Sequence, residues 1–110
     1  MRQKRTDEIM ILNVGLTNAE SERVKFLMEH FKKKYLYEVV AELINYIPAL
    51  EQVKINIPTK SMGETFNVRS LRLLAKDYEI IDKYAMQHFR DKNNTIRYFI
   101  NAAYQLINEE

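Results

Sequence analysis

The chain has 110 residues, of which 46% are hydrophobic and 29% are charged, which provides for one small core but not for two. Its formal net charge of +2 is too small to indicate a partner, so the distribution of charge is more informative than the sum. The absence of cysteine excludes a disulfide framework and a thiol nucleophile, and the absence of any apolar run near about twenty residues argues against a membrane-spanning helix. The N-terminal residues also lack the apolar core of a secretion signal, so we expect a single domain, residues 1–110, that is cytoplasmic and does not bind membranes.

A basic arm and a strand are predicted at the start of the chain. The cations of the arm are Arg2, Lys4 and Arg5. Alternation then predicts a strand, because its apolar side chains fall on one face: Met10, Leu12, Val14 and Leu16. The opposite face of this strand holds Ile11, Asn13 and Gly15.

Two helices are predicted after this strand. The capping-box sequence Thr17-Asn-Ala-Glu20 indicates the start of the first helix, which ends near the basic run 32–34, where cations complement the helix dipole. A second apolar series, from Val39 to Ile47, predicts another helix, which Pro48 ends. Residues 8–47 are therefore predicted to form a strand-helix-helix unit.

The connector, residues 48–66, contains a short alternating segment, 53–57. It is compatible with an added edge strand or with an extended linker over the surface, and we favour the linker. A rival arrangement pairs this segment with the strand that begins at Val68, which would make Lys54 and Asn56 the outward-facing residues.

The order strand, helix, helix is predicted again over residues 67–110. In the basic strand 68–73, the apolar face holds Leu71 and Leu73, and the opposite face holds Val68, Ser70 and Arg72. Arg69 departs from this alternation, because its position places it on the apolar face. A helix is predicted over 75–89, and Asn93-Asn94-Thr95 supplies N-cap chemistry for a last helix with its apolar residues on one side.

A single strand leaves its edge hydrogen bonds unmade, so each unit is expected to need a partner copy. The two halves of this chain could serve each other. Residues 25–34 match residues 83–92 at a constant offset of 58, with five of the ten positions identical, whereas the two strands align better at an offset of 57. The sequence thus suggests an internal repeat.

The sequence resembles the ribbon-helix-helix family of DNA-binding proteins, the MetJ/Arc class. The resemblance rests on Ser70-Leu-Arg-Leu73, on the strand that runs directly into the helix at Ala75, and on Asn93-Asn-Thr-Ile-Arg-Tyr-Phe-Ile100. It implies a mostly α fold with short β-strands, in which two strand-helix-helix units form a ribbon-helix-helix pseudo-dimer within one chain, similar to TraY-type accessory proteins. It also implies a sequence-specific DNA-binding protein, either a transcriptional repressor or an accessory factor for plasmid transfer, replication or partition.

In such a protein an antiparallel β-ribbon reads base edges in the major groove of double-stranded DNA. The residues on this chain that would read bases are Ser70, Arg72, Val68, Asn13 and Ile11, because Arg suits guanine and Asn suits adenine. The residues that would hold phosphates are Arg69, Asn93, Asn94, Thr95, Lys4 and Arg5. Self-association on adjacent DNA sites is a further expectation.

An enzyme is not expected. His30 and His88 have no second histidine or carboxylate at ligand spacing, and Gly15 and Gly63 belong to no phosphate-binding loop, so we predict no catalytic residue, metal or cofactor. The alternative function is a helical protein-interaction module, such as an antitoxin, whose ribbon mainly dimerises.

Overall fold

The computed structural model describes residues 8–58, 61–88 and 90–108. Its elements, in chain order, are β1 (Ile9–Leu16), α1 (Asn18–Phe31), α2 (Leu36–Ile44), α3 (Ile47–Leu50), β2 (Asn67–Leu74), α4 (Ala75–Gln87) and α5 (Lys92–Asn108). The predicted fold class, mostly α with short β-strands, is confirmed. Lys4 and Arg5 of the predicted basic arm lie outside the described residues.

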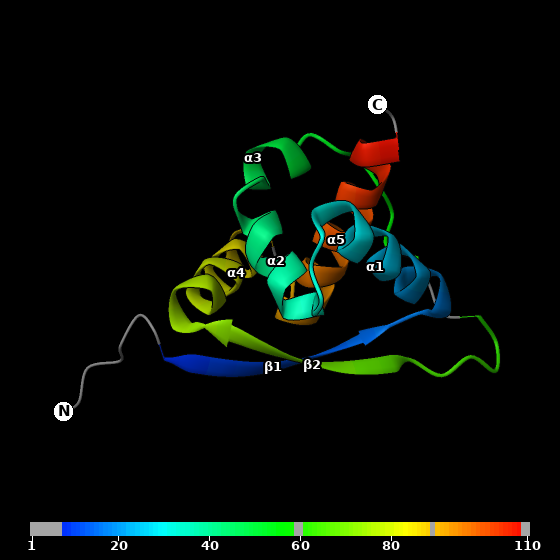
Figure 1. Ribbon diagram of the computed structural model, residues 1–110, viewed down its shortest axis with the longest axis horizontal. Helices are drawn as coiled ribbons and strands as arrows, with labels where there is room; N and C mark the ends of the chain where they lie inside the picture. Colours follow the sequence, from blue (N-terminus) through cyan, green and yellow to red (C-terminus); the bar gives the residue numbers. More distant parts are fainter. Residues whose placement is uncertain (1–7, 59–60, 89, 109–110) are drawn as a thin grey trace.

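The two strands pair with each other although 50 residues separate them in the chain. β1 and β2 are antiparallel, with a register that runs from Ile9 opposite Leu74 to Leu16 opposite Asn67. In Figure 1 this ribbon lies along one side of the molecule and the helices cover only one of its faces. The alternation in each strand is confirmed, because Val14 and Leu71 are buried beneath the helices whereas Ile11 and Arg72 are exposed.

Helix α5 forms the centre of the core. It packs against the other four helices and against β1, and every residue from Thr95 to Ala103 is buried. The prediction of one apolar side for this helix is therefore incomplete, because α1, α2, α3 and α4 surround the helix and bury it on all sides. The polar side chains of a helix in that position need hydrogen-bond partners inside the protein, and those that are buried on α5 are Thr95, Arg97 and Asn101.

Arg97 and Asn101 belong to a buried network around Glu20, which is 0% exposed. Arg97 Nε donates to both carboxylate oxygens of Glu20 at 2.9 and 3.1 Å, and Asn101 Nδ2 donates to Oε2 at 2.7 Å. The backbone N–H of Thr17 donates to Glu20 Oε1 at 3.0 Å, which completes the predicted capping box of α1. Arg97 Nη2 also donates to the carbonyl of Pro58, so one guanidinium ties α1, α5 and the connector together.

Three predicted helix boundaries are wrong. Helix α4 ends at Gln87, short of the predicted range 75–89, of which residue 89 lies outside the described residues. Helix α2 ends at Ile44, and Pro48 lies in the first turn of α3 instead of ending α2. Proline fits there because the first turn of a helix needs no N–H from it. The sequence predicts the N-cap of the last helix within Asn93–Thr95, but helix α5 begins earlier, at Lys92. It does so because the side chain of Asp91 accepts a hydrogen bond from Asn94 N at 2.6 Å.

The connector forms no strand between residues 53 and 58, which confirms the linker and excludes the rival hairpin with β2. It is nevertheless anchored to the core. Val53 is buried, and the hydroxyl of Tyr98 is within donating distance of the carbonyl oxygens of Leu50 (2.9 Å) and Val53 (2.7 Å). The position of this segment is therefore fixed by α5.

Candidate nucleic-acid interface

The uncovered face of the β1-β2 ribbon brings together the five residues predicted to read bases. Asn13 lies opposite Ser70 at the centre, with Ile11 opposite Arg72 on one side of this pair and Gly15 opposite Val68 on the other. The hydroxyl of Ser70 donates to Asn13 Oδ1 at 2.7 Å. This bond fixes the side-chain amide of Asn13 relative to its neighbour, so the centre of the face is polar and ordered.

Large apolar side chains flank this polar centre. Ile11 is 66% exposed, Val68 is 67% exposed and Ile9 is 52% exposed. Single exposed apolar residues are ordinary, but three on one open sheet face give this face apolar contact area on both sides of its polar centre.

The cations of the ribbon are on β2 only. Arg69 and Arg72 are both exposed, whereas β1 contains no charged residue. Arg69 lies opposite the buried Val14, so its position is on the face that the helices cover, yet its long side chain is exposed. The face is therefore asymmetric, with hydrogen-bonding and charged groups concentrated on the second strand.

The three residues at the start of α5 that are predicted to hold phosphates make hydrogen bonds within the protein. Thr95 is 0% exposed and its hydroxyl donates to Asp91 O at 2.9 Å, which argues against a phosphate contact by this side chain. Asn93 Oδ1 accepts from Gly15 N at 2.8 Å, which commits the side-chain oxygen to β1. The carboxylate of Asp91 occupies this helix N-terminus and accepts from Asn94, and its negative charge disfavours a phosphate there.

A second feature beside β2 was missed by sequence reasoning. Tyr35 and Tyr37, at the start of α2, stack with their ring centroids 5.5 Å apart and an interplanar angle of 10°. They line a hollow of about 450 Å³ together with Arg69 and Arg72. The local sequence signal for this feature is the pair of tyrosines that follows Lys34. In the structure the ammonium of Lys34 lies 5.8 Å from the ring centroid of Tyr35.

The described residues contain no group of three or more His, Cys, Asp and Glu side chains that could hold a metal ion. Both histidines contact aromatic rings. His30 lies against Phe31, with centroids 4.9 Å apart, and His88 stacks on Tyr84 at 4.1 Å. Among the same described residues, no helix has the length and apolarity to cross a bilayer.

The chain was compared with protein-family models, with curated proteins and with solved structures. None of the three comparisons finds a match. The functional interpretation therefore depends on the open ribbon face and its residues.

Proposed function

We propose that the protein binds double-stranded DNA in a sequence-specific manner, by inserting the β1-β2 ribbon into the major groove. The observation that supports this proposal most directly is the uncovered face of the ribbon, on which Asn13, Ser70 and Arg72 occupy adjacent positions. A major groove about 12 Å wide admits a two-stranded ribbon, and helices on the opposite face leave that approach open.

The side chains of this face match the chemistry of base edges. The guanidinium of Arg72 can donate two hydrogen bonds to guanine, and the amide of Asn13 can pair with adenine. Ile11 and Val68, which are apolar and exposed, suit the methyl group of thymine. The hydroxyl of Ser70 holds Asn13 in place and has acceptor capacity left for a base or a bridging water.

We further propose that the chain is a ribbon-helix-helix pseudo-dimer whose halves correspond at an offset of 57. Ser70 lies 57 positions after Asn13 and directly opposite it in the ribbon, as a two-fold axis through that pair requires. At the same offset, the N-cap Thr17 corresponds to the N-cap Leu74. Buried positions of α1 and α4 also correspond: Glu20 with Asp77, Val24 with Ile81, and Leu27 with Tyr84.

This correspondence bears on the ten-residue match at an offset of 58. That match superimposes the buried Leu27 on the buried Ala85, but extending it by one residue toward the N-terminus would place the buried Val24 on the half-buried Asp82. The offset of 57 instead relates strand, cap and first helix without a slip. Self-association on adjacent DNA sites remains an expectation for a single ribbon, because contacts between neighbours add affinity.

The alternative function, a module that binds a protein partner, draws support from the exposed apolar side chains of Ile9, Ile11 and Val68. The biological role within the DNA-binding class is a repressor or a plasmid transfer, replication or partition factor. A discriminating observation is what the chain retains on purification. Bound nucleic acid and retention on heparin support the DNA proposal, whereas a stoichiometric protein without nucleic acid supports the alternative.

The direct test is selection of bound molecules from a pool of random duplex DNA at two salt concentrations, with the mass measured by light scattering on the same sample. We expect one motif to be enriched and the affinity to fall with salt, because phosphate contacts release counterions. Replacing Arg72 with Ala should cost about 1–3 kcal/mol on the selected site and relax the sequence preference at one position.

A matched control is Lys25→Ala, which removes one positive charge from an exposed position on α1. It should leave the motif and the affinity nearly unchanged. Lack of enrichment at both salt concentrations, or unchanged binding by the double variant Ser70→Ala with Arg72→Ala, would refute reading by the ribbon.

A further inference from the structure

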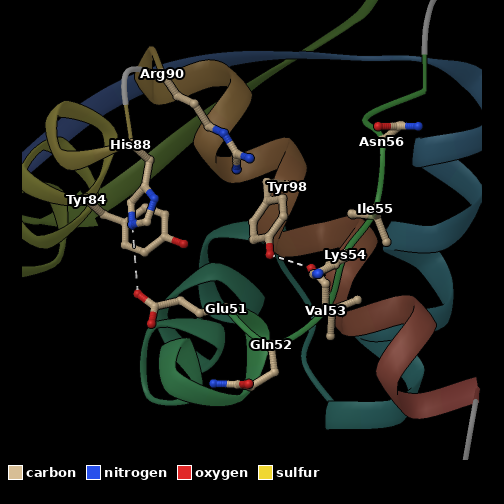
Figure 2. Close-up of a pocket in the computed structure, with 10 residues that line it drawn as sticks. All are labelled: Glu51, Gln52, Val53, Lys54, Ile55, Asn56, Tyr84, His88, Arg90 and Tyr98. Atoms are coloured by element: carbon tan, nitrogen blue, oxygen red, sulfur yellow. Dashed lines mark hydrogen bonds and ion pairs between the residues drawn. The ribbon is translucent and has the colours of Figure 1, made fainter.

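A cleft of about 710 Å³ opens between the end of α4, the chain that follows α3, and α5. Figure 2 shows the side chains around it. The volume is within the range of about 300–1,000 Å³ that is typical of small-molecule sites. None of the lining residues comes from β1 or β2, so this cleft is a surface separate from the open face of the ribbon.

Cationic and aromatic side chains line the cleft from different elements. The guanidinium carbon of Arg90 lies 4.3 Å from the ring centroid of Tyr98, and Lys54 reaches the cleft from the connector. Stacking on an aromatic ring orients the planar donor group of an arginine. In Figure 2 the guanidinium of Arg90 and the hydroxyl of Tyr84 point toward the space between the labelled side chains.

The charge balance of the cleft favours an anion. Arg90 and Lys54 are opposed by one carboxylate, that of Glu51, which lies 4.0 Å from Nε2 of His88. Burial raises the pKa of Tyr84, and the negative charge of Glu51 adds to this rise. The Tyr84 hydroxyl therefore keeps its proton at neutral pH and is available as a hydrogen-bond donor.

We propose that this cleft binds a small organic anion, whose phosphate or carboxylate group is held by Arg90 and Lys54 and receives a hydrogen bond from Tyr84. The donor fork of arginine matches both anionic groups. The volume is too large for an inorganic ion alone, so the remaining space accommodates the body of the molecule beside the Tyr98 ring and the connector.

The test is a titration of the full chain with four probes. Binding is monitored through the backbone amide signals of residues 51–56 and 90 in a ¹H–¹⁵N spectrum. The probes are adenosine 5′-monophosphate, benzoate, inorganic phosphate and uncharged adenosine. We expect adenosine monophosphate or benzoate to shift these signals at millimolar concentration, and adenosine to leave them unchanged. Arg90→Gln and Lys54→Gln should each weaken the binding by about tenfold or more, because each removes a charge-assisted hydrogen bond.

Lys25→Gln is the matched control, since it removes the same charge outside the cleft and should leave the binding unchanged. The proposal is wrong if no anionic probe shifts these signals, if inorganic phosphate binds as tightly as the organic anions, or if neither cleft variant weakens binding. It is also wrong if duplex DNA shifts the same signals and depends on Arg90, because the cleft would then extend the DNA interface. Failure of the ribbon to bind DNA would leave the probe titration unaffected, so the two proposals are tested separately.

Discussion

Replacing Arg97 with Leu would leave the carboxylate of Glu20 buried without its cation. The Glu20 side chain is 0% exposed and that of Arg97 is 9% exposed, so water cannot substitute for the lost guanidinium. The remaining donors to the carboxylate are neutral groups of Thr17 and Asn101. The carbonyl of Pro58 also loses its hydrogen bond from Arg97, which loosens the connector.

Removal of one partner from a buried ion pair costs about 3–5 kcal/mol, because an uncompensated charge stays in the interior. A domain of this kind has about 5–15 kcal/mol of total stability, so the variant would lose a large part of it. At about 5 °C per kcal/mol, the expected fall in Tm is roughly 15–25 °C. Urea unfolding followed by circular dichroism gives the free energy, and an unchanged m value would show that the folded state is still compact.

The double variant Glu20→Gln with Arg97→Leu separates charge from packing. Gln removes the buried charge and can still accept from the Thr17 backbone. We expect the double variant to be more stable than Arg97→Leu alone by at least about 1 kcal/mol, because it leaves no buried charge. A loss below about 1 kcal/mol in the single variant, or no recovery in the double variant, would refute this reasoning about a buried charge.

Three further predictions concern the core and the first helix. Tyr98→Phe should lower the free energy of unfolding by about 1–3 kcal/mol in chemical denaturation, because the carbonyl oxygens of Leu50 and Val53 lose their shared donor. Burial raises the pKa of Tyr84 and of Tyr98 above the unfolded value, so folding favours the protonated phenols. The free energy of unfolding should therefore be level up to about pH 10 and fall above it. Thermal unfolding across pH 8–11 checks this, and rising stability above about pH 10 would contradict it. Thr17→Val should cost about 1 kcal/mol, because the backbone N–H of Glu20 loses the hydroxyl oxygen that accepts its hydrogen bond at the N-cap. Thr17→Ser, which keeps the hydroxyl, should cost less in a thermal unfolding measurement.

The two strands were predictable because alternation is a local pattern with a period of two residues. It located β1 and β2 and identified which side chains face outward, including Asn13, Ser70 and Arg72. The capping box at Thr17 was predictable for the same reason, since its partners are three residues apart. The base-reading role assigned to these outward residues stays a prediction until binding is measured.

The start of α5 was less predictable because several residues compete for the same cap. The run 91–95 contains an aspartate, two asparagines and a threonine, all of which are good N-cap residues. Asp91 takes the position in the structure, and Asn93 instead accepts from the backbone of Gly15, 78 residues away. Propensity alone cannot rank candidates when one of them is needed elsewhere in the fold.

By itself the sequence determined the elements whose signal lies within a few residues: the two alternating strands, the periodic helices and the cap of α1. The tertiary structure decided what surrounds each element. It placed α5 at the centre, paired Glu20 with Arg97 across 77 positions, and joined Lys54, Arg90 and Tyr98 around one cleft. These features depend on contacts through space between segments that are distant in the chain. A periodic pattern along the chain contains no information about which distant side chain will pair with a buried charge.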